Sequence, residues 1–176
     1  MSISQLSAIL FVEPVVYLRK LNRRSDWGIS GDPRDGRVAH AAERVFETDP
    51  TSKYSLYRVR SSVELQRVAV GLNGNRHSLV ENLDLISFTP DELSTCGIVL
   101  TETAGETRCL AANRLHVDVE ASKDQLTRLC RLAMDAGRSS ARVSKSIMRG
   151  VASELTTFGC HATTDAADHP CGCESD

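Results

Sequence analysis

The chain has 176 residues, of which 41% are hydrophobic, 25% charged and 5% aromatic, with 21 basic side chains against 23 acidic ones. This composition excludes collagen-like, coiled-coil and wholly disordered chains, and the length suits a single domain. No apolar run approaches the roughly 20 residues that cross a bilayer, and no basic segment precedes the first apolar one. We therefore expect a cytoplasmic protein without a membrane partner, and the preference for arginine over lysine is bacterial-like in composition.

The first half of the chain alternates apolar segments with turn-forming ones. Ser61 and Glu64 have the spacing of a capping box, and Thr89-Pro90 is typical of a helix N-cap followed by proline. In chain order, the patterns predict a strand or short helix over 6–21, a loop over 25–37, a helix over 38–46, a strand over 54–60, a helix over 63–72, a strand over 83–88 and a short helix from 90 onward. For residues 64–72, the alternating apolar residues make a strand the alternative to the predicted helix.

The second half contains the clearest strand patterns, followed by two helices. Residues 98–103 and 107–112 flank a turn and predict a hairpin, and residues 115–120 predict a third strand. Capping and helical periodicity predict two C-terminal helices over about 122–136 and about 140–155. We therefore predict a single α+β domain over 1–159, in which an antiparallel sheet with its core at about residues 97–120 packs against the two C-terminal helices.

A basic stripe on the C-terminal helices is the first candidate site. Its members follow helical spacing on the second helix and extend onto the first: Arg138, Arg142, Lys145, Arg149, Arg128 and Arg131. Cations on one face neutralise phosphates and release counterions, so the stripe predicts non-specific contact with nucleic acid or contact with an acidic protein partner. The competing interpretation is a solvated helix face whose cations pair with acids elsewhere in the fold.

The strand over 115–120 carries the second candidate site. Its period-two geometry places His116, Asp118 and Glu120 on one face, where they could anchor a divalent ion or exchange protons. This is the basis of the alternative function, a metal-dependent hydrolase or nuclease-like enzyme. An ordinary half-solvated antiparallel strand shows the same alternation, so the pattern has a purely structural explanation as well.

The third candidate is the acidic tail over 160–176, which has no long apolar residue and is predicted to be flexible. Its metal-ligand types are Cys160, His161, His169, Cys171 and Cys173. Zinc prefers four such ligands in a tetrahedron, but adjacent ligands and a single-residue spacing depart from the usual zinc knuckle. The alternatives are incidental thiols or a tail that is itself modified. Cys96, Cys109 and Cys130 fall in apolar patterns and are predicted core thiols.

The sequence thus favours a non-catalytic intracellular binding or accessory module over an enzyme. A binding module needs only a charged surface, which the basic stripe provides. An enzyme needs converging groups in a cleft, for which the sequence offers only the three polar residues of the 115–120 strand. Zinc in the tail is the one cofactor that the sequence suggests.

Overall fold

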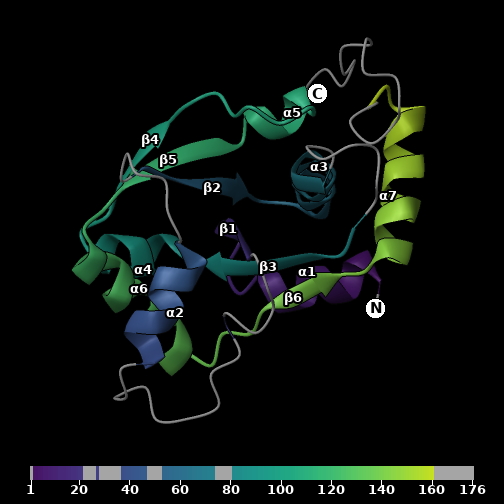
Figure 1. The fold of residues 1–176 in the computed structure, drawn as a ribbon. Coiled ribbons are helices and arrows are strands. Elements are labelled where there is room, and N and C mark those ends of the chain that lie inside the picture. Colours follow the sequence, from purple (N-terminus) through teal and green to yellow (C-terminus); the bar gives the residue numbers. More distant parts are fainter. Residues whose placement is uncertain (1, 22–26, 28–36, 47–52, 74–80, 161–176) are drawn as a thin grey trace.

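The computed structural model describes residues 2–21, 27, 37–46, 53–73 and 81–160, and these residues form an α+β fold (Figure 1). The helices are α1 (Ile3–Leu10), α2 (Arg37–Val45), α3 (Ser62–Asn73), α4 (Pro90–Thr95), α5 (Leu110–Asn113), α6 (Lys123–Asp135) and α7 (Lys145–Thr157). The strands are β1 (Val16–Leu21), β2 (Lys53–Val59), β3 (Leu83–Phe88), β4 (Val99–Glu102), β5 (His116–Glu120) and β6 (Ala141–Val143). None of these helices is long and apolar enough to span a membrane.

The strands form one antiparallel sheet in the order β4-β5-β2-β1-β3-β6. Strand β1 lies inside the sheet, where Leu18 is in register with Tyr57 of β2 and with Ser87 of β3. The strands from the 97–120 segment, β4 and β5, occupy one edge, and β6 occupies the other. The predicted α+β class and antiparallel sheet are confirmed, and the sheet extends well beyond that segment.

Helices cover both faces of the sheet, because alternate residues along its strands are apolar on both sides. On β1, Leu18 packs in the core formed with α1, α3, α5 and α7, whereas Tyr17 packs in the core formed with α2, α4 and α6. Figure 1 shows the same division of the helices around the sheet. The predicted C-terminal helices therefore both pack on the sheet, but α6 and α7 lie on opposite faces.

Local capping signals are confirmed where the chain uses side chains to begin a helix. Thr89 and Glu92 form a reciprocal capping box at the start of α4, with Pro90 at the first helical position. Ser122 and Gln125 do the same for α6. At the start of α3, the Ser61 hydroxyl accepts from the Glu64 N–H, but the Glu64 carboxylate accepts from the N–H of Arg60 and not of Ser61. This segment is a helix rather than the alternative strand. Each box satisfies backbone N–H groups that the first helical turn leaves without partners.

The predicted hairpin between 98–103 and 107–112 is wrong. Strand β4 pairs directly with β5, with Val99 opposite Glu120, and the intervening chain forms a turn followed by α5. Asn113 holds that turn, because its side chain accepts hydrogen bonds from the backbone N–H and the hydroxyl of Thr107 and donates one to the Thr107 carbonyl. These buried contacts use the backbone groups of Thr107 that a strand would need.

The predicted start of the last helix at about residue 140 is also wrong. Ala141 and Val143 are buried members of the edge strand β6, which pairs with β3. Helix α7 begins only at Lys145, after the N-cap Ser144. The four-residue apolar spacing that begins at Val143 therefore runs from a strand residue into helix α7, and sequence periodicity alone does not show where the strand ends and the helix begins.

Candidate functional site

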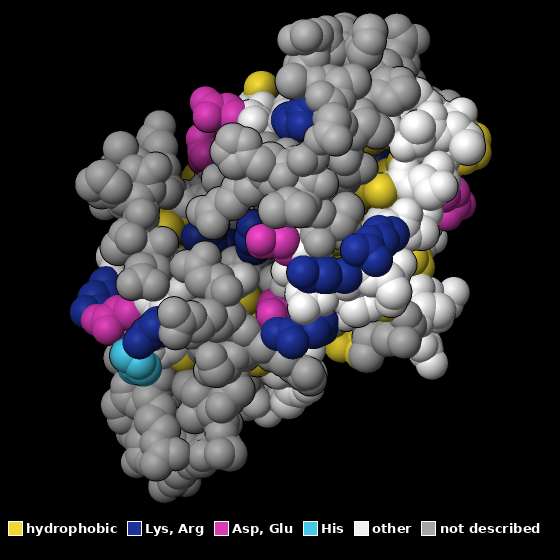
Figure 2. Space-filling model, turned by 45° about the vertical axis from the view of Figure 1, so that its right-hand side comes forward, with side chains coloured by type: hydrophobic (Ala, Val, Ile, Leu, Met, Phe, Trp, Pro, Cys, Tyr) yellow, Lys and Arg dark blue, Asp and Glu magenta, His cyan; other side chains and the backbone are white. Residues whose placement is uncertain are grey.

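The predicted basic stripe is divided among four structural positions. Arg138 lies in the loop after α6, Arg142 lies on β6, and Lys145 and Arg149 lie on α7. The two remaining members, Arg128 and Arg131, lie on α6, across the sheet from α7. The prediction that four of these cations share one helix face is wrong, because the chain between Arg138 and Lys145 is a loop and a strand. Figure 2 turns the side with α7 forward and shows basic side chains near acidic ones.

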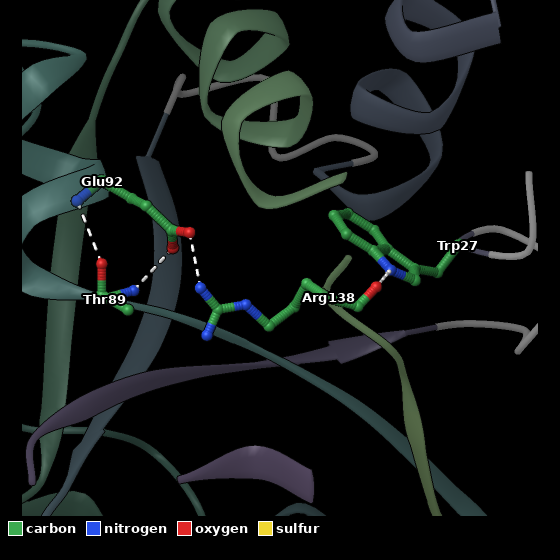
Figure 3. Close-up of polar contacts among 4 residues, drawn as sticks. All are labelled: Trp27, Thr89, Glu92 and Arg138. Carbon is green, nitrogen blue, oxygen red and sulfur yellow. Dashed lines mark hydrogen bonds and ion pairs between the residues drawn. The ribbon is translucent and has the colours of Figure 1, made fainter. Parts of the chain in front are cut away.

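Arg138 is a buried structural cation rather than a surface one. Its side chain is 6% exposed, and its Nη2 donates a hydrogen bond of 2.5 Å to Oε1 of Glu92, whose side chain is 12% exposed. The other carboxylate oxygen of Glu92 accepts from the backbone N–H of Thr89 (Figure 3). The Arg138 carbonyl accepts from the indole N–H of Trp27 at 2.8 Å. This network joins the loop after α6 to the start of α4.

Arg138 also carries two buried nitrogens, Nε and Nη1, that have no hydrogen-bond partner among the described residues. It lines a cavity of about 650 Å³ together with Arg142 and the hydroxyl side chains of Ser139 and Ser140. Both nitrogens are buried and Glu92 already neutralises the guanidinium, so Arg138 brings no unbalanced charge to the wall of this cavity. The residue therefore adds no free cation to a partner-binding surface.

Arg142 is partly exposed but also neutralised. Its guanidinium donates two hydrogen bonds to Asp84, from Nε at 2.8 Å and from Nη2 at 2.7 Å. The Asp84 side chain is 8% exposed, whereas that of Arg142 is 42% exposed. The hydrogen bonds to Asp84, and then its charge, raise the pKa of Arg142 above its usual value. This bidentate pair fixes Arg142 across the β3–β6 register, in which Asp84 and Arg142 are opposite.

Lys145 and Arg149 remain an exposed pair on α7, as Arg128 and Arg131 do on α6 across the sheet. They lie on successive turns of α7, both are exposed, and the described residues contribute no carboxylate within ion-pair distance of either. The first turn of α7 contains no acidic residue. Its N-cap contact is long, since the Ser144 hydroxyl accepts from the Ile147 N–H at 3.5 Å. We call Lys145 and Arg149 the α7 basic pair.

The fold brings the three residues of the 115–120 strand candidate together only in part. Nδ1 of His116 lies 2.9 Å from the Thr103 hydroxyl, and Nε2 lies 3.9 Å from Oδ1 of Asp118. The His116 ring is buried and meets the Tyr57 ring edge-on, with centroids 5.3 Å apart. Glu120 is exposed at the end of β5, so the predicted shared face exists without a compact cluster. Among the described residues, no three His, Cys, Asp or Glu side chains are placed to hold a metal ion.

Of the tail candidates, only Cys160 belongs to the described residues. It is 2% exposed and packs in the core beside Cys109, so it does not face solvent as a zinc ligand in a flexible tail would. His161, His169, Cys171 and Cys173 lie outside the described residues. The zinc prediction therefore stays a prediction, and it concerns those four residues.

The residues that sequence reasoning missed are the acidic partners of the basic stripe, Asp84 and Glu92. Both partners are far away in sequence, so no local pattern indicates them. Ser144 before an apolar helical pattern is the one local signal that predicts the true start of α7. Comparison of the chain with protein-family models, with curated proteins and with solved structures gives no match, so function is argued from the residues themselves.

Proposed function

We propose that this protein is a non-catalytic binding module that contacts an acidic segment of a partner protein through the α7 basic pair, Lys145 and Arg149. Arg142, on the preceding strand, stands at the edge of this surface with its charge balanced by Asp84. The proposal keeps the binding role expected from the basic stripe. It leaves out Arg138 and Arg142, whose charges are balanced by acids, and the two α6 arginines, which lie across the sheet from α7.

The charge pattern at the start of α7 carries the proposal. A helix N-terminus bears partial positive charge, so acidic residues stabilise the first turn and basic ones oppose it. Helices α3, α4 and α6 each have an acid in the first turn, whereas α7 has Lys145 and none; α1, α2 and α5 also lack an acid there, and α2 begins with Arg37. Helix α6 also begins with a lysine, but Lys123 is ion-paired with Glu43 and followed by Asp124. The α7 arrangement opposes stability, and an incoming carboxylate would relieve it.

The number of unbalanced cations favours an acidic protein segment over duplex nucleic acid. Two unpaired cations correspond to about two phosphate contacts and a slope near −2 in log K against log salt, which gives little affinity at physiological salt. Carboxylates of a flexible acidic segment can approach Lys145 and the helix N-terminus together. The alternative enzyme has weaker support, since His116 is packed on Tyr57 and is not among the residues that line the cavity beside Arg138.

The test uses two probes, a fluorescent glutamate-rich peptide and a duplex DNA, titrated with the full chain at several salt concentrations. We expect the peptide to bind more tightly than the duplex, and the Lys145→Glu, Arg149→Glu double variant to bind the peptide at least about tenfold more weakly. The matched control is Arg128→Glu, Arg131→Glu, which reverses two exposed cations on α6. Equal losses in both double variants would show a general charge effect and would refute the assignment to α7.

A further inference from the structure

Two cysteines that are distant in sequence lie side by side in the core. Cys109 is the N-cap residue of α5, and Cys160 follows the end of α7, 51 positions later. Their sulfur atoms are 3.8 Å apart, and the exposed fractions of the two residues are 0% and 2%. A disulfide needs the sulfurs to approach to about 2.05 Å, so a closure of less than about 2 Å joins them.

We propose that Cys109 and Cys160 are a site of oxidative modification, at which a low-molecular-weight disulfide such as glutathione disulfide converts the two thiols into an intramolecular disulfide. The Cys160 thiolate attacks one sulfur of glutathione disulfide, which forms a mixed disulfide and releases one glutathione. The Cys109 sulfur then attacks the Cys160 sulfur and releases the second glutathione. The two protein thiols lose two electrons and two protons, and glutathione disulfide gains both.

The local structure gives the oxidant a route to Cys160. Helix α7 ends at the C-cap Phe158 and is followed by Gly159, which has a positive φ of 80°. The Cys160 N–H donates to the Leu155 carbonyl at 3.0 Å. Phe158 in this turn is 70% exposed. Opening of a terminal turn exposes few apolar contacts and costs less than opening a sheet, so Cys160 reaches solvent before the rest of the core does. Cys160 is therefore the attacking residue and Cys109 the resolving one.

Cys109 reacts slowly while the core is closed. Its contact with the Cys160 thiol and its burial raise the pKa of Cys109, which keeps the thiol protonated at neutral pH. Formation of the mixed disulfide at Cys160 removes that thiol contact. The cross-link then ties the chain just after α7 to the start of α5.

The experiment oxidises the full chain with glutathione disulfide, blocks the remaining thiols, and maps the cross-links by mass spectrometry. Trypsin followed by cleavage before aspartate separates the Cys109 peptide, residues 109–114, from a Cys160 peptide, residues 150–164, that lacks Cys171 and Cys173. We expect these two peptides to be joined, with an intact mass lower by two hydrogen atoms. Because the bond closes a loop of about 50 residues, we expect oxidation to raise Tm by roughly 5–15 °C.

Variants separate this bond from other oxidation events. In Cys160→Ala and Cys109→Ala, the difference in Tm between oxidised and reduced protein should vanish, whatever the basal stability of each variant. In the control Cys130→Ala, which alters another buried thiol, that difference should persist. A cross-link map confined to Cys96–Cys130 or to the tail cysteines would overturn the proposal, and so would unchanged mass after prolonged oxidation at mildly alkaline pH.

Discussion

Replacing Lys145 with glutamate should make the protein more stable while it weakens binding of the acidic probe. Lys145 occupies the first position of α7, where its charge meets the positive end of the helix. Arg149 lies four positions later, so the pair also places two like charges on neighbouring turns. Glutamate reverses both interactions: it favours the helix N-terminus and forms an attractive i,i+4 pair with Arg149. The intrinsic helix propensities of lysine and glutamate are nearly equal, so they contribute little to the difference.

The magnitude follows from these two contributions. Charge at a helix terminus changes stability by about 0.3–1 kcal/mol, and an i,i+4 pair changes it by about 0.2–0.5 kcal/mol, each counted once for the lost lysine and once for the gained glutamate. Because Lys145 is exposed, the lower end applies, and we expect a gain of about 1 kcal/mol at low salt. For a chain of this size, that gain corresponds to roughly 2–4 °C in Tm.

Thermal unfolding at low and high salt, with circular dichroism as the signal, measures this effect. The matched control is Lys123→Glu, at the same position of α6, where the lysine is ion-paired with Glu43. That substitution brings two carboxylates together and should not raise Tm. If Lys145→Glu lowers Tm, or if its gain does not shrink as salt is added, then helix-end electrostatics do not govern this site. If the more stable variant binds the acidic peptide as well as the original protein does, Lys145 is not part of the interface.

Three further predictions concern the core and the tail. Glu92→Ala should lower the free energy of unfolding, measured by chemical denaturation, by about 3–5 kcal/mol, because it leaves the buried charge of Arg138 without a partner. The Arg138→Met, Glu92→Ala double variant should be more stable than Glu92→Ala, and a less stable double variant would contradict this prediction. Burial raises the pKa of Tyr57 to about 12, so the folded state holds the phenol proton more tightly than the unfolded state does. The stabilisation from this proton should be fully present below pH 10 and be lost between pH 10 and pH 12. Tyr57→Phe should remove that part of the pH dependence in alkaline unfolding curves. If the tail binds zinc, metal analysis will find zinc in the full chain and none in a chain that ends at Gly159, whereas equal zinc in both forms would exclude the tail.

Elements specified by neighbouring residues are those that the sequence predicts well. The capping boxes at Thr89 and Ser122 involve residues three positions apart, and each predicted helix begins where the box places it. The strand over 54–60 and the strand over 83–88 are also found close to the predicted bounds. In these segments, local hydrogen bonding and the wider fold favour the same structure, so no distant contact is needed to choose it.

Elements decided by distant contacts are those that the sequence misses. Residues 107–112 have the apolar content of a strand, but β4 pairs with β5, in which Val99 lies opposite Glu120, and the nearby Asn113 side chain then occupies the backbone groups of Thr107. The strand candidate shows the same limit. Alternation correctly places His116 and Asp118 on one face, yet only the packing of Tyr57 against His116 shows that the histidine is largely enclosed.

The charge layout of the proposed interface follows from the edge strand β6. If residues 140–155 formed one helix, Arg142 would lie inside it, one turn before Lys145, and neither would occupy a helix end. Pairing of β6 with β3 instead brings Arg142 opposite Asp84, where the carboxylate neutralises it. The helix must then restart after Ser144, which leaves Lys145 at its first position with no acid beside it. The same pairing that neutralises one cation of the basic stripe therefore creates the unfavourable helix start at which we propose that an acidic partner binds.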